Sequence, residues 1–188
     1  TVQTGLRTHI PVHGHHQLRI VTLRNIPDTM KIKSYIQTYH PRSAIVVGGG
    51  YIGVEMAENL KNAGLEVTIV ELADHLIAPL DFDMAADVHR YIKDNGIRLE
   101  LSNGVEAIEE TDSGLSVFLQ NGRIETDMLI MSVGVRPETD LAKKAGISVN
   151  ARGSIEVNCH MQTNDADIYA VGDAVQVKNY ITREPSFI

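Results

Sequence analysis

The stretch AIVVGGGYIGVEMAENL, at residues 44–60, constrains the possible fold of this chain more than any other. It opens with an apolar run rich in β-branched side chains, which is typical of a strand buried on both faces. Consecutive glycines follow, and apolar residues then recur at helical spacing as far as Leu60. Gly64 stands where a left-handed helix end favours glycine. The pattern predicts a strand over 44–48, a tight turn and a helix over 51–63.

Strand-like and helix-like segments alternate on both sides of this stretch. The further elements that we expect are strands at 20–26, 65–71 and 97–101 and helices at 28–39 and 81–94. Asp28 is the expected N-cap of the first of these helices. Strands that alternate with helices at this spacing predict a parallel sheet with right-handed crossovers.

The periodicity changes after residue 104. Segments 105–110, 115–120 and 123–127 alternate with period two and are separated by TDSG and NG, which are typical hairpin turns. They predict a small antiparallel meander, whereas the apolar run 128–134 is expected to rejoin the parallel sheet. The remaining expected elements are a helix at 138–146 and strands at 154–158 and 167–174.

The glycines satisfy the pattern G-x-G-x-x-G between an expected strand and an expected helix. Gly48 allows the tight turn, Gly50 lets a pyrophosphate approach the backbone, and Gly53 lets the helix pack closely on the strand. The helix N-terminus offers N–H groups and a positive dipole end to the phosphates. The expected fold class is therefore α/β: a Rossmann-like three-layer domain with a parallel sheet, helices on one face and the antiparallel meander on the other.

Glu71 is the acid that such a site needs, 18 residues after Gly53 at the end of the next expected strand. Its carboxylate can accept both hydroxyls of an adenosine ribose. It would also repel a 2′-phosphate, since two unit charges at ~4 Å cost about 4 kcal/mol at an intermediate dielectric. No Arg or Lys follows in ELADHLIAPLDFD, so the sequence favours NADH over NADPH. The alternative is a plain glycine turn with Glu71 as a solvated strand end.

The composition bears on partners and location. A net charge of −7 argues against nucleic acid as the main partner, because phosphate binding needs a basic face. No apolar run approaches the ~18 residues of a membrane-spanning helix, so no membrane partner is expected. The N-terminal residues lack the apolar core of a signal peptide. A single cysteine, Cys159, cannot form an internal disulfide, so we expect a cytoplasmic protein.

Other reactive side chains have more ordinary explanations than catalysis. Asp81 and Asp83 are expected to cap a helix rather than to act as a carboxylate pair. Cys159 is expected to be a half-buried structural thiol rather than a nucleophile. A solvated loop is favoured over a metal cluster for the four N-terminal histidines, His9, His13, His15 and His16. No catalytic residue and no metal ligand is therefore assigned within this chain.

Three segments together resemble the FAD-dependent pyridine nucleotide-disulfide oxidoreductases: AIVVGGGYIGVEMAENL, MLIMSVGVRPET and TNDADIYAVGDAV. The segment TLRNIPDTMKIK is similar to the subgroup of coenzyme A-disulfide reductases, NADH oxidases and NADH peroxidases. The likeness extends from Ile20 to nearly the end of the chain. It implies an enzyme, in its full-length form, that passes hydride from NADH to FAD and on to a disulfide, dioxygen or peroxide.

The resemblance also implies which residues touch the cofactors. The NADH contacts would be Gly48, Gly49, Gly50, Tyr51, Ile52, Gly53, Glu55, Glu71, Val133 and Gly134. Gly172, Asp173 and Ala174 match a second motif, in which the Asp binds the ribityl chain of FAD. This sequence has SVG before residue 135, where many family members have AIG or ATG.

The family's own FAD glycine loop, redox cysteine and dimerisation domain are not matched by this chain. We therefore expect an NADH-binding domain at 43–135, a flanking segment from the FAD-domain side at 1–42 and a return segment toward the FAD domain at 136–188. On this interpretation the full-length protein is a homodimer, and the chain alone has no turnover. The alternative is a non-catalytic NADH-sensing or partner-binding module.

Overall fold

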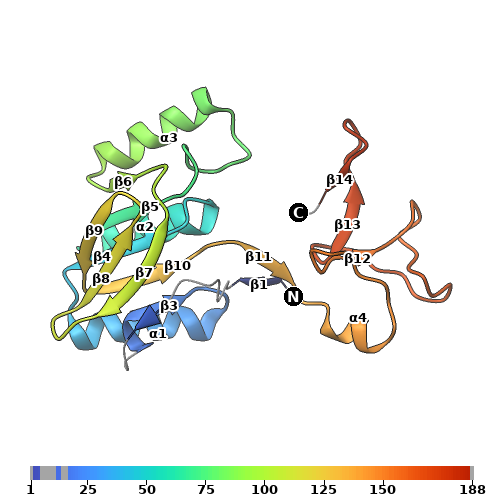
Figure 1. Cartoon of the computed structure of the whole chain (residues 1–188), viewed down its shortest axis with the longest axis horizontal. Coiled ribbons are helices and arrows are strands. Elements are labelled where there is room, and N and C mark those ends of the chain that lie inside the picture. The colour runs from blue at the N-terminus through green and yellow to red at the C-terminus, as the bar shows by residue number, and fades with distance from the viewer. Residues whose placement is uncertain (1, 5–11, 14–16, 187–188) are drawn as a thin grey trace. The chain divides into compact units, whose positions relative to one another are not determined.

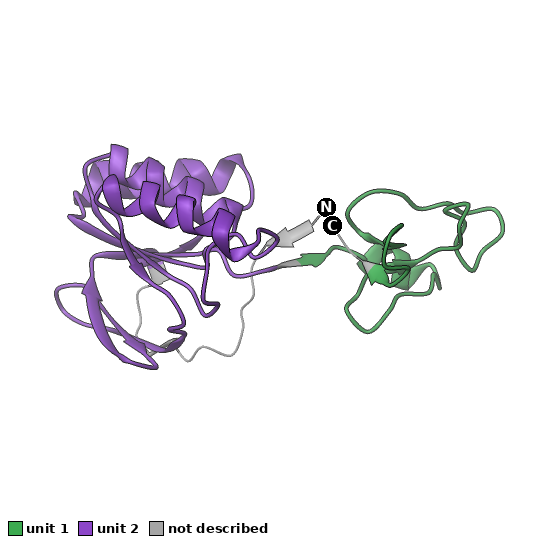
Figure 2. Cartoon of the chain, turned by 90° about the horizontal axis from the view of Figure 1, so that it is seen from above, with its two compact units in different colours: residues 1–6, 135–188 green, residues 7–134 purple. Residues whose placement is uncertain are grey.

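The computed structural model describes residues 2–4, 12–13 and 17–186 and divides the chain into two compact units (Figure 2). One unit comprises residues 7–134, and the other comprises residues 1–6 and 135–188. The expected histidine loop falls largely outside the described residues, which include only His13 of its four histidines. Within the described ranges, no helix is long and apolar enough to cross a membrane, and no three His, Cys, Asp or Glu side chains form a metal-binding group.

A five-stranded parallel sheet forms the centre of the unit 7–134 (Figure 1). Its order is β3-β10-β4-β5-β6. The bounds are Ile20–Thr22 for β3, Met128–Met131 for β10, Ser43–Val47 for β4, Glu66–Val70 for β5 and Arg98–Glu100 for β6. Residues 20–39, expected as part of a flanking segment, therefore contribute an edge strand and a helix to this unit.

Helices cover one face of this sheet and a second sheet covers the other, as Figure 2 shows for this unit. The helices are α1 (Ile26–Tyr39), α2 (Tyr51–Asn62) and α3 (Phe82–Asp94). The second sheet has the order β2-β7-β8-β9, with bounds Val12–His13, Val105–Glu110, Leu115–Leu119 and Gly122–Thr126. The expected three-layer α/β fold is confirmed.

Strand β4 explains why two cores form. Ala44 and Val46 pack into the helix-side cluster, whereas Ile45 and Val47 pack into the cluster with the second sheet. Successive side chains of a strand point to opposite faces, so a continuous apolar run can serve both layers. The short 3-10 helix Gln17–Arg19 precedes this sheet in the chain.

The helix ends follow from identifiable capping residues. Gly64 has φ +92°, and the hydrogen bonds from Leu65 N to the Leu60 carbonyl and from Gly64 N to the Lys61 carbonyl form a Schellman motif. At the start of α1 the expected N-cap, Asp28, is wrong. The cap is Asn25, whose side chain accepts a hydrogen bond from Asp28 N at 3.0 Å, because the helix starts at Ile26 with Pro27 in its first turn.

Asp127 ties the second sheet to the start of β4. It lies between β9 and β10, and its Oδ2 accepts hydrogen bonds from Arg42 N at 2.6 Å and Ser43 N at 3.0 Å. In return, Asp127 N donates to Ser43 Oγ at 3.1 Å. These bonds fix the end of the meander beside the first residue of β4.

We expect Asp127→Ala to lower the free energy of unfolding by about 2 kcal/mol, because two backbone donors lose a charged acceptor. D127N keeps one side-chain oxygen and is expected to lose less. Urea denaturation measures both. Asp87→Ala is the control: among the described residues the Asp87 side chain pairs only with Arg90, at an exposed position, so its loss is expected to cost about 0.5 kcal/mol or less. Equal losses for Asp127 and Asp87 would contradict this role.

The described residues of the unit 1–6 and 135–188 include only short helices and strands. Strands β1 (Val2–Thr4) and β11 (Val135–Pro137) pair, and β12 (Ile155–Glu156), β13 (Val175–Lys178) and β14 (Pro185–Ser186) form a small sheet. Helix α4 spans Asp140–Lys144, within the expected helix.

Two expectations for this unit are wrong: the strand at 167–174 and the half-buried position of Cys159. Thr163 Oγ1 lies 3.1 Å from the Asp165 carbonyl and 3.0 Å from the Ile168 carbonyl, and it also accepts a hydrogen bond from Asp165 N at 3.1 Å, which holds the chain in turns. Gly172, at φ +96°, then delays the strand until Val175. Cys159 is exposed and unpaired by disulfide.

Candidate dinucleotide-binding site

The strand register brings three chain segments together at one edge of the parallel sheet. Val47 of β4 is level with Val70 of β5 and with Met131 of β10. Gly48, Glu71 and Ser132 follow these residues directly and therefore lie side by side. The chain continues from β4 to β5 on one side and later returns to β10 on the other, which is the switch point where open α/β sheets bind ligands.

Gly48 makes the tight turn after β4. Its φ is +104°, a conformation that L side chains rarely adopt, and a Cβ there would lie 2.6 Å from the carbonyl oxygen of Ser132. The turn is held from both neighbouring strands. Gly48 N donates to the Val70 carbonyl at 2.9 Å, and Ser132 Oγ lies 2.9 Å from the Val47 carbonyl and 3.1 Å from the Gly48 carbonyl.

Gly53 and Gly50 are glycine for different reasons. A Cβ on Gly53 would overlap the carbonyl oxygen of Gly48, so a side chain there would push α2 off the turn. Gly50 is exposed, and a Cβ there would meet nothing within 4 Å. The open space beside Gly50 is where a ligand can reach the backbone.

The N-terminus of α2 faces the same space. Its first intrahelical hydrogen bond runs from Val54 N to the Gly50 carbonyl at 3.0 Å, so the N–H groups of Tyr51, Ile52 and Gly53 precede the bonded turns. Tyr51 is exposed there, with a relative exposure of 62%. Backbone donors and the positive end of the helix dipole together suit an anion at this position.

Glu71 is bound to the glycine turn. Its Oε2 accepts a hydrogen bond from Gly49 N at 2.6 Å, and its Oε1 accepts one from Ala73 N at 2.8 Å. These two bonds fix the half-buried carboxylate, which still has lone pairs that can accept hydrogen bonds from ribose hydroxyls. The acid and the turn are thus one hydrogen-bonded constellation.

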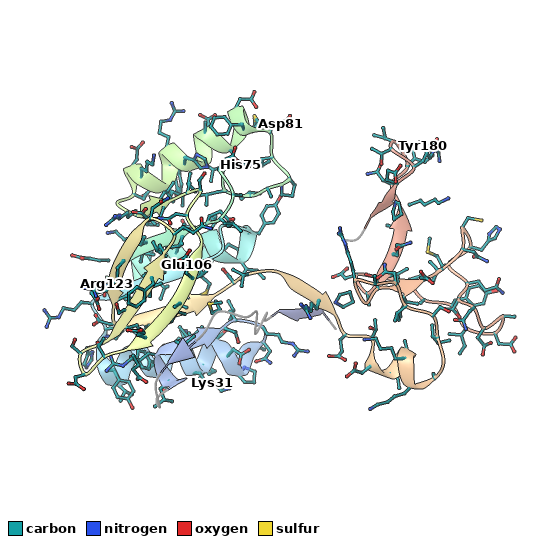
Figure 3. The ribbon with its side chains drawn as sticks, viewed as in Figure 1. Lys31, His75, Asp81, Glu106, Arg123 and Tyr180 are labelled. Atoms are coloured by element: carbon teal, nitrogen blue, oxygen red, sulfur yellow. The ribbon has the colours of Figure 1, made fainter. Side chains whose placement is uncertain are left out.

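The loop between β5 and α3 and the helix α3 itself support this constellation through His75 and His89, whose spacing in the sequence carries no signal. Ile77 N donates to the Gly49 carbonyl at 2.8 Å, and Leu76 N donates to Nε2 of His89 at 3.0 Å. Burial lowers the pKa of His89. The Asp74 carboxylate, whose Oδ1 accepts a hydrogen bond from His75 Nδ1 at 2.6 Å, raises the pKa of His75. Figure 3 shows His75 and Asp81 near the start of α3.

The other expected contacts are placed as follows. Glu55 is exposed on α2, and Val133 and Gly134 follow β10 at the same sheet edge. Asp81 occupies the N-cap position of α3 but makes no capping hydrogen bond, and Asp83, in the first turn, accepts a hydrogen bond, among the described residues, only from the N–H of the next residue, Met84.

Gly172, Asp173 and Ala174 belong to the other unit. Gly172 and Asp173 are exposed, and the Gly172 carbonyl accepts a hydrogen bond from Val175 N at 3.1 Å, closing a turn. The Ala174 carbonyl accepts one from Ile155 N at 2.8 Å. Sequence reasoning missed Ser132, Leu76 and His89, which act on the glycine turn through tertiary contacts.

The residues at the sheet edge fit the adenosine diphosphate half of a nicotinamide dinucleotide. The open backbone at Gly50 and the first N–H groups of α2 suit the diphosphate, and the fixed carboxylate of Glu71 suits a ribose. The fold and its glycine turn define a Rossmann-like α/β domain.

Comparison with known proteins then identifies the family. A model of the family described as pyridine nucleotide-disulphide oxidoreductase matches residues 2–185, and the chain belongs to this family. Its members use FAD and NAD(P)H. The resemblance inferred from the three motifs is confirmed.

Individual relatives agree with this assignment. The chain is 40% identical over 183 residues to an NADH oxidase of Methanocaldococcus jannaschii, covering 96% of this chain and 41% of that protein. The crystal structure of reduced CoADR-RHD of Bacillus anthracis has a TM-score of 0.89 at 44% identity, covering 100% of this chain and 33% of that one. The structure of the water-forming NADH oxidase of Lactobacillus brevis, bound to NADH, has a TM-score of 0.84 at 27% identity, covering 95% of this chain and 39% of that one. The chain thus spans less than half the length of these relatives.

Proposed function

We propose that this chain is the NADH-binding part of an FAD-dependent oxidoreductase that passes reducing equivalents from NADH through flavin to a disulfide, dioxygen or peroxide. The observation that carries the proposal is the hydrogen bond between Glu71 and Gly49, which joins a ribose-binding acid to a diphosphate-binding turn. The similarity to an NADH oxidase and to CoADR-RHD supports the redox role.

In this proposal the residues of the chain bind and orient, while the flavin supplies the redox chemistry. The α2 N-terminus and Gly50 hold the diphosphate, and Glu71 accepts hydrogen bonds from the adenosine ribose. Tyr51, Ile52, Glu55, Val133 and Gly134 face the nicotinamide half. Gly172, Asp173 and Ala174 contribute to the FAD site. The resemblance supports a homodimer of the full-length protein, and the single cysteine supports a cytoplasmic location.

We further propose a preference for NADH over NADPH. The fixed negative charge of Glu71 opposes a 2′-phosphate at the position where it holds the ribose. An engineered water-forming NADPH oxidase, 26% identical to this chain and bound to NADPH, differs from its parent by substitutions that remove an aspartate and introduce two arginines. That exchange of charge agrees with the role given to Glu71.

A fluorescence titration tests NADH binding by the folded chain. We expect saturable binding with a dissociation constant in the micromolar range or above, and no NADH oxidation in air without the rest of the protein. Gly50→Ala should weaken binding about tenfold, or about 1.4 kcal/mol, because its methyl group would enter the space next to the backbone. A folded chain that binds no NADH would refute the proposal.

A further inference from the structure

The segment 71–77 holds the glycine turn through contacts with Gly49. Glu71 accepts a hydrogen bond from Gly49 N, and Ile77 N donates one to the Gly49 carbonyl, so both backbone polar groups of Gly49 are bound to the segment. The fully buried Leu76 side chain occupies the place that a Cβ on Gly49 would take. The position of the turn therefore depends on the position of Leu76.

His89 fixes Leu76. It lies on α3 with a relative exposure of 9%, and its Nε2 accepts the hydrogen bond from Leu76 N at 3.0 Å. A histidine nitrogen accepts a hydrogen bond only when it carries no proton. The bond therefore exists only with a neutral imidazole whose proton is on Nδ1.

We propose that His89 is a positioning residue of the dinucleotide site: its neutral imidazole holds segment 71–77 on the glycine turn, and protonation of Nε2 releases it and weakens nucleotide binding. This inference rests on the proposed function. His89 does not touch the nucleotide, and it acts through Leu76 and Gly49.

Protonation has a defined physical effect at this position. A proton on Nε2 would face the N–H of Leu76, leaving two donors without an acceptor in a buried place. Burial, then the charges of Lys93 and His75, lower the pKa of His89, while Asp74 acts in the opposite direction. The Phe82 ring stands edge-on to both His75 and His89, at 6.2 and 6.4 Å between ring centroids.

The sign of the pH dependence follows from this shift. Because burial lowers the pKa of His89 in the folded chain, its contribution to the free energy of unfolding is present above the unfolded value of about 6.5 and is lost as the pH falls through the lowered folded value. His75 behaves in the opposite way. Asp74 raises its pKa, so its contribution to the free energy of unfolding is present below about 6.5 and is lost as the pH rises through the raised folded value. Substitutions of His89 and of His75 therefore separate the two pH-dependent contributions.

Calorimetric titration with ADP-ribose tests the proposal on the full chain between pH 7.5 and 5.0. This probe has the diphosphate and the adenosine ribose of NADH and is stable in acid. We expect the affinity to fall about tenfold over this range. His89→Gln, whose amide oxygen can replace Nε2 as acceptor, should bind as the unmodified chain does at pH 7.5 and lose the pH dependence. His89→Leu should bind about tenfold more weakly throughout.

His75→Gln is the matched control and should keep the fall in affinity in acid. The proposal is overturned if His89→Gln retains the pH dependence or if folded His89→Leu binds like the unmodified chain. NMR provides a readout that does not need a ligand: the amide signals of Leu76 and Gly49 should titrate together with the His89 ring, and not in His89→Gln. Failure to bind ADP-ribose at pH 7.5 refutes the proposed function, whereas independent titration of these amides refutes the role of His89.

Discussion

Gly53→Ala is expected to lower the free energy of unfolding by about 3 kcal/mol, the upper range for forcing extra atoms into a packed site. The added methyl group would overlap the Gly48 carbonyl oxygen and crowd Ser132 Oγ at 2.9 Å. A backbone atom cannot swing aside as the end of a side chain can. Glycine to alanine within a helix ordinarily stabilises it by about 1 kcal/mol, so the expected effect has the opposite sign to helix propensity.

Urea denaturation of Gly53→Ala and Gly50→Ala measures the difference. Gly50 has an ordinary backbone conformation, with φ −72°, and open space beside it. Gly50→Ala should lower the free energy of unfolding by less than about 1 kcal/mol, the scale of an N-cap change, but it should weaken NADH binding. The two variants thus separate an effect on folding stability from an effect on ligand binding. Equal stability of Gly53→Ala and the unmodified chain would show that α2 does not need its close approach to the turn.

The local sequence pattern is sufficient to predict an element where one interaction dominates its structure. Strand β7 has the bounds that period-two alternation indicated, 105–110, because one face of the meander packs on the parallel sheet. The glycine turn was predictable for a similar reason, since Gly48 and Gly53 each occupy a position that excludes a side chain.

Competing local signals explain the wrong predictions for the N-cap of α1 and for the strand at 167–174. Asn25 and Asp28 are both good N-caps, and the sequence alone did not show that Pro27 would place the cap at Asn25. At 167–174 the apolar residues suggested a strand, but hydroxyl and amide side chains nearby satisfy the backbone in turns.

The support of the site was not predictable from spacing. The bond from Leu76 N to His89 joins a loop to a helix 13 residues further along the chain. Nothing about the two positions signals the contact before α3 is docked on the sheet. The same holds for Ser132, whose hydroxyl reaches the Val47 and Gly48 carbonyls across 85 and 84 residues.

Glu71→Arg is expected to change the preference between NADH and NADPH by about a hundredfold in favour of NADPH. Two unit charges at ~4 Å interact by about 4 kcal/mol at an intermediate dielectric, and solvent at this half-buried position reduces that toward the ~2.7 kcal/mol of a hundredfold ratio. The substitution replaces repulsion of a 2′-phosphate by attraction. The measurement is the ratio of the two dissociation constants by fluorescence titration.

Absolute affinity carries separate information, because Glu71 also holds the turn. Arginine at this position cannot accept the hydrogen bonds from Gly49 N and Ala73 N, so NADH binding should weaken beyond the loss of the ribose contact. E71Q keeps an amide oxygen for one of these donors and removes the charge. It should relax the discrimination against NADPH without creating a preference for it. If both variants left the ratio unchanged, Glu71 would serve the turn alone and the ribose would lie elsewhere.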